Sequence, residues 1–85
     1  SDKRPAEKAE KKKLSYKLQR ELDMLPEQIA TAEAERDNIV AVTEAADFYS
    51  GDQDHVQATL AKLAEIEEQL EALEMRWLEL EEMTE

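Results

Sequence analysis

The chain has 85 residues, of which 41% are hydrophobic and 39% are charged, and its formal net charge at pH 7 is −11. A globular domain carries about 25% charged residues, so this composition argues against a broad apolar core. One glycine, two prolines and four aromatic residues supply too few turn-formers and large side chains for a multistranded sheet or barrel. The composition therefore favours long helices.

Cysteine is absent from the sequence, which excludes a disulfide framework, a thiolate zinc site and a cysteine nucleophile. No apolar run approaches the roughly 20 residues of a membrane span, and the first residues contain no apolar signal-like stretch. We therefore expect a cytoplasmic protein that does not enter a membrane.

Basic and acidic side chains are separated along the chain. Residues 1–20 contain eight basic and three acidic side chains, a net charge of +5, whereas residues 21–85 contain three basic and nineteen acidic ones, a net charge of −16. Basic segments attract polyanions through counterion release, and acidic segments repel them. We expect nucleic acid to contact the basic segment, although its composition also fits a solvated linker. The candidate binding residues are Arg4, Lys8, Lys11, Lys12, Lys13, Lys17 and Arg20.

Residues 1–13 contain, apart from Pro5, no apolar side chain larger than alanine, so a disordered lead-in or linker is expected there. Apolar residues at heptad spacing then predict a first helix over about residues 14–46. Pro26 lies inside this helix, where it removes one backbone hydrogen bond and clashes with the preceding turn. We expect a kink or a break nearby that makes residues 14–25 a hinged first section. The apolar positions are Leu14, Leu18, Leu22, Leu25, Ile29, Ala32 and Ile39.

The apolar pattern stops at a turn predicted over residues 47–52. Gly51 is expected to supply a positive φ angle there, and either Asp52 or Asp54 is expected to cap the next helix. That second helix is predicted over about residues 53–83, with Leu60 widening its apolar stripe. Its two heptad rows are Val56, Leu63, Leu70 and Trp77, and Ile66, Leu73 and Leu80.

Two helices of similar length joined by a short turn pack antiparallel. The predicted fold is therefore all-α, an antiparallel two-helix coiled-coil hairpin over residues 14–85. Folding at the turn places the small side chain of Ala32 near Leu70. Arg36 occupies a seam position, from which its guanidinium is expected to reach a carboxylate such as Glu67. The other expected pairs are Leu22 with Leu80, Leu25 with Trp77 and Ile39 with Leu63.

A family resemblance is carried by short segments that occur in a specific order over residues 13–82. The segments are Lys13-Leu14-Ser15-Tyr16-Lys17, Gln19-Arg20-Glu21-Leu22, Leu25-Pro26 with Ile29, Asp47-Phe48-Tyr49 with Asp52 and Val56, and Glu74 with Arg76-Trp77 and Glu79-Leu80-Glu81. Together they resemble the C-terminal domain of the ABC-F ATP-binding cassette proteins, specifically their Uup-like bacterial members. The chain departs from the family pattern at Gln53, where many relatives carry proline, and at Leu78, where a polar residue is common.

The resemblance implies a two-helix coiled coil that follows two nucleotide-binding cassettes through a basic linker. It implies DNA binding by this domain in Uup-like members, whereas the family as a whole acts on ribosomes. ATP would be bound by the cassettes of the full-length protein, so no cofactor is expected in this chain.

Other residues with chemical potential have simpler interpretations. Phe48 and Tyr49 either stack on an exposed base or close the open end of the helical seam. His55 is expected on the surface and Trp77 in the core. The glutamates of residues 65–82 radiate from an exposed helix, so we expect neither a metal site nor a catalytic acid/base pair among them. A single glycine cannot form a glycine-rich phosphate loop, and no enzymatic activity is expected in this chain.

Two functions from different classes remain open. In the first, the chain is a non-catalytic domain of a Uup-like ABC-F ATPase that binds DNA, including branched DNA, or ribosomal RNA through its basic section. In the second, the hairpin is a structural interaction module that docks on the ATPase cassettes or on the ribosome. Met75 and Leu78 lie off the main apolar stripe and are expected to contact such a partner or the section before Pro26. We expect a monomer with either function.

Overall fold

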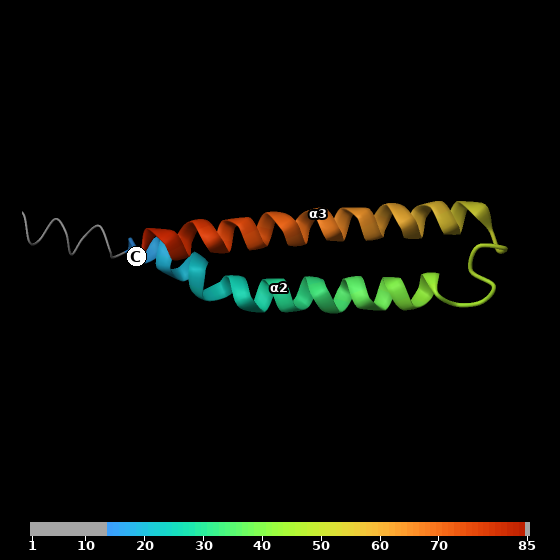
Figure 1. Cartoon of the computed structure of the whole chain (residues 1–85), viewed down its shortest axis with the longest axis horizontal. Helices are drawn as coiled ribbons and strands as arrows, with labels where there is room; N and C mark the ends of the chain where they lie inside the picture. Colours follow the sequence, from blue (N-terminus) through green and yellow to red (C-terminus); the bar gives the residue numbers. More distant parts are fainter. Residues whose placement is uncertain (1–13, 85) are drawn as a thin grey trace, which may run out of the picture.

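The computed structural model of the chain describes residues 14–84. Over this range it contains two helices, α2 at Tyr16–Thr43 and α3 at Gln53–Met83, and no strand. The helices lie side by side and run in opposite directions, so that the start of α2 and the end of α3 share one end of the molecule (Figure 1). The predicted all-α antiparallel hairpin is confirmed. The lead-in expected over residues 1–13 lies outside the described residues.

The first helix begins where Ser15 caps it. Ser15 has an extended backbone (φ −60°, ψ 162°), and its hydroxyl accepts a hydrogen bond from the Leu18 amide at 3.2 Å. This bond satisfies one of the amides that the first turn of a helix leaves free, and such caps stabilise a helix by about 1 kcal/mol. α2 therefore begins at Tyr16 rather than at Leu14.

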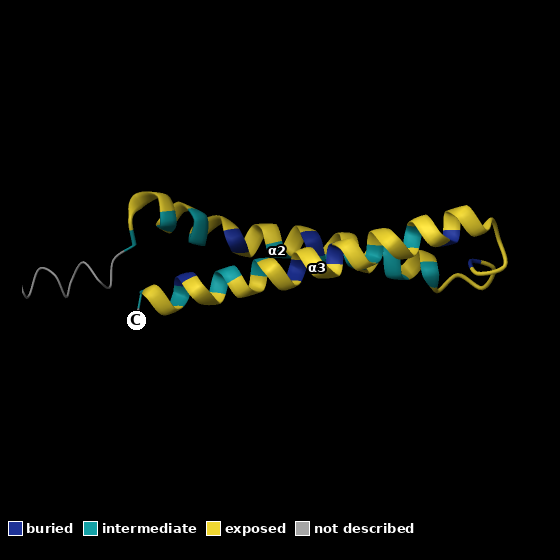
Figure 2. Cartoon of the chain, turned by 90° about the horizontal axis from the view of Figure 1, so that it is seen from above, coloured by how far each residue is buried: buried dark blue, intermediate teal, exposed yellow. Residues whose placement is uncertain are grey.

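Pro26 bends α2 without interrupting it. The helix is continuous from Tyr16 to Thr43 with Pro26 inside it. In two views at right angles, its first turns are inclined to the remainder (Figures 1 and 2). A proline ring displaces the carbonyl four residues earlier and donates no hydrogen bond, which produces a kink at that place. Of the two expected outcomes, a kink and a break, the structure has the kink.

The turn between the helices consists of successive short-range hydrogen bonds. Phe48 N donates to Ala45 O at 3.0 Å, and Gly51 N donates to Phe48 O at 3.3 Å. Gly51 does not have a positive φ, so the expected left-handed conformation at Gly51 was wrong. Bonds that span three residues form with right-handed backbone angles, and no left-handed residue is needed to close this turn. α2 ends at Thr43, three residues before the predicted end.

Asp52, rather than Asp54, caps α3. Asp52 has an extended backbone, and its carboxylate accepts a hydrogen bond from Asp54 N at 3.2 Å. The side chain of the next residue, Gln53, donates to Tyr49 O and to Gly51 O, each at 3.1 Å. The start of α3 is thereby tied to the turn that precedes it.

The core is a narrow seam between the two helices (Figure 2). Its centre is a buried cluster of Ala32, Ile66 and Leu70, which places the small side chain opposite large ones as the register predicts. Ile29, Ile39 and Leu73 pack against this cluster and are partly buried. The other buried apolar residues among residues 14–84 are Leu25 and Leu80 near the open end of the hairpin and Phe48 and Val56 near the turn.

Two seam positions differ from expectation. Trp77 is half-buried rather than fully enclosed. Leu60 remains 37% exposed and therefore adds little to the core. A seam formed by only two helices covers each side chain from one direction, so a large ring such as that of Trp77 keeps one edge in water.

Candidate nucleic-acid interface

Two of the seven predicted binding residues lie within the described part of the chain. Lys17 and Arg20 are exposed on the first two turns of α2. The other five, which are Arg4, Lys8, Lys11, Lys12 and Lys13, lie outside the described residues. The described structure therefore establishes the surroundings of the last part of the basic section only.

Arg20 is held against the ring of Tyr16, one helical turn before it. Its Nη1 donates a hydrogen bond to Tyr16 Oη at 3.2 Å, and its guanidinium carbon lies 5.8 Å from the ring centroid. Residues four apart lie on the same face of a helix, and a guanidinium near an aromatic face is attracted by the ring. Tyr16 nevertheless remains 77% exposed. The first turns of α2 thus present an aromatic ring and two cations to solvent.

An ion pair joins the two helices beside this surface. Arg76 Nε donates to Glu21 Oε2 at 2.6 Å, and Arg76 Nη2 donates to Glu21 Oε1 at 3.0 Å. Arg76 Nη1 also donates to Glu79 Oε1 at 3.1 Å. These two-point contacts fix the position of the first turns of α2 relative to α3.

The pair also shifts the titration of both groups. The hydrogen bonds from Arg76 hold the pKa of the Glu21 carboxyl below its usual value, because they favour the charged form. The pKa of Arg76 is raised, first by its hydrogen bond to Glu21 and then by its hydrogen bond to Glu79. Glu21 and Arg76 are each 37% exposed, so solvent screens part of their attraction.

The cations within residues 14–84 fall into two groups. Arg36, Lys62 and Arg76 each have a carboxylate oxygen within 4.0 Å. Lys17 and Arg20 have no carboxylate partner within this distance among the described residues. Arg36 pairs with the adjacent Asp37 at 3.1 Å, so the expected contact with Glu67 was wrong. A neighbouring residue costs a long side chain less conformational entropy than a partner on the other helix.

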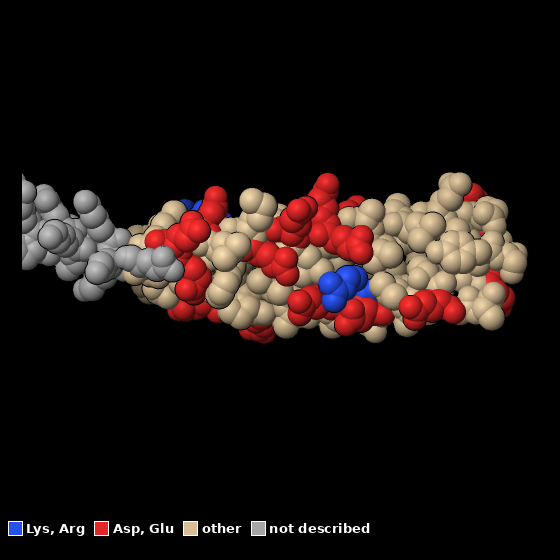
Figure 3. All heavy atoms as spheres, viewed as in Figure 1, with Lys and Arg blue, Asp and Glu red and all other residues tan. Residues whose placement is uncertain are grey.

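The remainder of the hairpin is acidic. In Figure 3 carboxylates are distributed along the face in view, with few basic side chains among them. This distribution matches the net charge of −16 over residues 21–85. A polyanion that approaches this part of the molecule is repelled, whereas Lys17 and Arg20 at the start of α2 carry positive charge without a carboxylate partner within residues 14–84.

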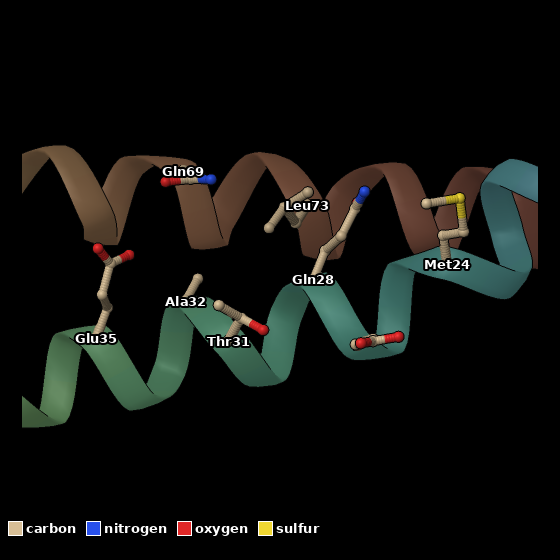
Figure 4. A pocket seen from close by; sticks show the side chains of 8 residues that line it. Met24, Gln28, Thr31, Ala32, Glu35, Gln69 and Leu73 are labelled. Atoms are coloured by element: carbon tan, nitrogen blue, oxygen red, sulfur yellow. The ribbon is translucent and has the colours of Figure 1, made fainter.

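A groove lies beside the first turns of α2. It has a volume of about 500 Å³, and its lining residues are Tyr16, Lys17, Arg20, Glu21, Met24 and Gln28. A second groove of about 490 Å³ continues from it between α2 and α3, and the two share Met24 and Gln28 (Figure 4). Ala32 and Leu73 line this second groove together with Glu35 and Gln69. The basic end of the combined groove is therefore the end nearest to Tyr16.

The turn end of the hairpin is closed by aromatic packing. Phe48 is 6% exposed, and its ring meets the rings of Tyr49 and His55 edge to face, at centroid distances of 4.8 and 5.8 Å. Tyr49 and His55 themselves remain exposed. Phe48 thus closes the seam, in agreement with the simpler of its two interpretations.

No group of three His, Cys, Asp or Glu side chains within residues 14–84 is arranged to hold a metal ion. Neither α2 nor α3 contains a stretch that is long and apolar enough to cross a bilayer.

Sequence reasoning missed two features of the interface. Tyr16 was not among the predicted site residues, although its spacing of four from Arg20 is the spacing at which such pairs meet on a helix. The bond between Glu21 and Arg76 joins positions 55 residues apart. The predicted register places Arg76 opposite Pro26, five residues from Glu21, so it does not predict this pair.

This arrangement, an acidic two-helix hairpin with a basic start, places the chain in the class of helical-hairpin proteins. The chain matches the model of the family described as the ABC transporter C-terminal domain over residues 13–82, and it belongs to that family.

Its relatives include the ATP-binding protein Uup of Escherichia coli strain K12, which is 41% identical over 69 residues that cover 81% of this chain and 11% of the relative. The ATP-binding protein Uup of Haemophilus influenzae is 44% identical over 72 residues, which cover 82% of this chain and 11% of the relative. A Uup-like ATP-binding protein of the same organism is 40% identical over 70 residues, which cover 82% of this chain and 15% of that relative.

The resemblance to Uup-like ABC-F proteins is confirmed by these matches. The chain spans only between 11% and 15% of the length of these relatives. No solved structure matches the chain significantly.

Proposed function

We propose that this chain is a non-catalytic DNA-binding C-terminal domain of a Uup-like ABC-F ATPase and that it binds through its basic N-terminal section. The observation that carries the proposal is the separation of charge. The net charge is +5 over residues 1–20 and −16 over residues 21–85. Lys17 and Arg20 are the cations without a carboxylate partner within residues 14–84, and they continue the basic section onto α2.

Phosphates are the natural ligands of such a surface. Lysine and arginine side chains displace the counterions of DNA, and this exchange gives affinity without requiring contacts to particular bases. Binding of this kind tolerates different sequences. The described surface contains no helix that combines several base-reading side chains in one patch, as specific readout in the major groove requires.

The acidic hairpin does not prevent this binding. Its 31-residue helix α3 extends about 46 Å at 1.5 Å per residue, whereas charges are screened over about 8 Å at physiological salt. The carboxylates of the turn therefore barely influence phosphates bound at the other end. Glu21 is close to the basic section, but Arg76 neutralises it through two hydrogen bonds. The hairpin then acts as a spacer that points away from the DNA.

The ATPase function would belong to other parts of the full-length protein. The relatives are named ATP-binding proteins, and this chain corresponds to a small fraction of their length. We place ATP in the cassettes of the full-length protein and assign no catalytic group or cofactor to this chain. A cytoplasmic location and a monomeric state are part of the same proposal.

A titration with duplex and branched DNA at several salt concentrations tests DNA binding. If about five cations contact phosphates, the logarithm of the affinity should fall with a slope near −4.5 against the logarithm of salt. This slope is a roughly 500-fold loss between about 50 and 200 mM salt.

Reversing the charge of basic side chains tests which surface of the chain binds DNA. Replacing Lys11, Lys12, Lys13 and Lys17 with glutamate should abolish most of the binding. The matched control is Lys62→Glu, which changes the same kind of side chain on α3, where Lys62 lies 3.7 Å from Glu65. A flat salt response, or an unchanged affinity in the fourfold variant, would contradict the proposal. A parallel titration with ribosomal RNA distinguishes the two polyanions.

A second function, docking of the hairpin on its own ATPase cassettes or on the ribosome, is favoured by one observation. Met75 and Leu78 on α3 are 61% and 52% exposed, and a partner could cover them. If this function applies, Leu78→Glu should abolish binding to the purified cassettes while deletion of residues 1–13 leaves it intact. Unchanged binding of the Leu78→Glu variant to the cassettes would contradict this function.

A further inference from the structure

We propose that the groove beside Tyr16 binds an unpaired nucleotide of single-stranded DNA, with its base stacked on the Tyr16 ring and its phosphates at Lys17 and Arg20. This inference rests on the proposed DNA-binding function and adds the class of DNA that the site prefers. It is carried by three observations on the described residues, which are the exposure of the ring, the charge of the groove and the size of the groove.

The Tyr16 ring is available for stacking. It is 77% exposed, although apolar rings are normally covered in a folded protein. Ser15 fixes the start of the helix through its hydrogen bond to Leu18 N at 3.2 Å, and Arg20 holds the phenol oxygen at 3.2 Å. The ring is therefore positioned before any ligand arrives, which lowers the entropy cost of binding.

The groove is electrostatically suited to phosphate. Two of its six lining residues, Lys17 and Arg20, are cations without a carboxylate partner within residues 14–84, and Glu21 is its single acidic residue. Arg76 pairs with Glu21 at 2.6 and 3.0 Å, which cancels most of that negative charge. Arg76 is thus a positioning residue that acts on the ligand through Glu21. The same acidic side chain without its partner would oppose phosphate binding.

The size and lining of the groove fit one nucleotide. Its volume of about 500 Å³ lies within the roughly 300–1,000 Å³ of small-ligand sites. Met24 is 49% exposed and gives the groove an apolar side chain, while Gln28 supplies an amide (Figure 4). A base in a duplex has both faces covered by its neighbours, so only an unpaired base can offer a free face to Tyr16. Lys17 and Arg20, in contrast, serve phosphates of either form of DNA.

The experiment compares a single-stranded oligothymidine with a duplex of the same length, titrated against the 85-residue chain at fixed salt. Tyr16→Leu removes the aromatic face but keeps an apolar side chain, and the matched control Tyr16→Phe keeps the face but loses the hydroxyl. Stacking on an aromatic side chain is worth a roughly 5- to 150-fold change in affinity per base. We expect Tyr16→Leu to weaken oligothymidine binding by this factor and duplex binding by less than about twofold. Tyr16→Phe should bind both forms of DNA nearly as well as the unmodified chain.

The outcomes separate this inference from the function on which it rests. If the unmodified chain binds duplex DNA with a steep salt dependence but Tyr16→Leu binds both forms of DNA as before, DNA binding stands and the nucleotide site is refuted. Equal losses on both forms also refute the site. If the unmodified chain binds neither form, the proposed function itself fails.

A second measurement does not depend on the folding of a variant. The ring resonances of Tyr16 in the unmodified chain should shift upfield when oligothymidine is added, because a stacked base shields the ring protons. They should remain nearly unchanged with the duplex. A shift of equal size with both forms of DNA, or with neither, overturns the inference.

Discussion

The two ends of the hairpin are built from different kinds of contact. At the open end, where α2 begins and α3 ends, the polar link is the bond between Glu21 and Arg76, which joins residues 55 positions apart. At the turn end, Asp52 caps α3 two residues away and Phe48 packs against Tyr49 and His55. The open end leaves Lys17 and Arg20 without a carboxylate partner within residues 14–84. The charged turn residue Asp52 has a local hydrogen-bond partner.

This contrast separates a binding end from a structural end. A side chain that is already satisfied by its neighbours has little to gain from a ligand, because binding would first break an existing contact. Among residues 14–84, Lys17 and Arg20 have no carboxylate partner to give up when a ligand arrives, and Arg20 exchanges only its contact with Tyr16. The acidic turn end is therefore expected to keep the chain folded, whereas the open end is expected to bind.

The largest change in the free energy of unfolding is expected from a substitution in the seam at the open end. Leu80 is fully buried, with 0% exposure, whereas Leu60 nearer to the turn is 37% exposed. Leu80→Ala should lower the free energy of unfolding by about 2–5 kcal/mol, and the matched control Leu60→Ala should lower it by less than about 1 kcal/mol. Urea denaturation followed by circular dichroism measures both changes. Equal effects would mean that the two ends are packed alike.

Substitutions of the aromatic residues at the two ends should also differ in their effect on the free energy of unfolding. Phe48→Leu keeps an apolar side chain but loses the edge-to-face contacts with Tyr49 and His55, which should cost about 1 kcal/mol of unfolding free energy. Tyr16→Leu at the open end should change it by less than about 0.5 kcal/mol, because Tyr16 is mostly exposed. Thermal denaturation of the two variants measures this difference. A larger loss for Tyr16→Leu would assign Tyr16 a structural role and weaken the contrast.

A substitution at the turn should change the free energy of unfolding by a smaller amount and should raise it rather than lower it. An added Cβ at Gly51 meets only the carbonyl oxygens of Asp47 and Phe48, both at 3.6 Å, and φ is not positive there. Gly51→Ala should therefore raise the free energy of unfolding by about 0.4–1 kcal/mol, because alanine restricts the unfolded chain. Gly51→Asn is the control, since asparagine tolerates the left-handed conformation better than alanine does. If the asparagine variant is more stable than the alanine variant, residue 51 adopts the left-handed conformation that the sequence predicted.

The last prediction concerns pH at the open end. Hydrogen bonds from Arg76 lower the pKa of Glu21 in the folded chain below its usual 4.5. The pair therefore contributes stability above about pH 4.5, and this contribution is lost as the pH falls through the lowered pKa. A carbon NMR titration should show the Glu21 carboxyl titrating at lower pH in the unmodified chain than in Arg76→Gln. Identical titrations would mean that the ion pair does not persist in solution.

The helices and their order were predictable because they depend on local sequence. Heptad spacing of apolar residues, a cap at Asp52 or Asp54 and a kink or break at Pro26 each involve residues within about two turns of one another. The structure then selects Asp52 and the kink. The register was also predictable at the level of Ala32, since Ala32 and Leu70 belong to one buried cluster. A large side chain opposite a small one leaves no void.

The wrong predictions concern residues that can adopt several local conformations or contact several partners. At Gly51, glycine permits a left-handed conformation but does not require one, and the turn closes with right-handed angles. Arg36 could reach carboxylates on either helix, and it contacts Asp37 rather than Glu67. In each case the residue type allows more than one geometry of similar energy, so the pattern of residue types does not select among them.

The sequence by itself determined that this chain is a helical hairpin with a basic start and an acidic body, because periodicity and charge order are properties of the covalent chain. Only the tertiary structure decided which cations within residues 14–84 lack a carboxylate partner and where the groove lies. The pairing of Arg76 with Glu21 depends on the level at which α3 returns past α2, and the groove between the helices depends on how α2 and α3 pack. Both features depend on contacts between the two helices, and the positions of these residues along the chain do not specify those contacts.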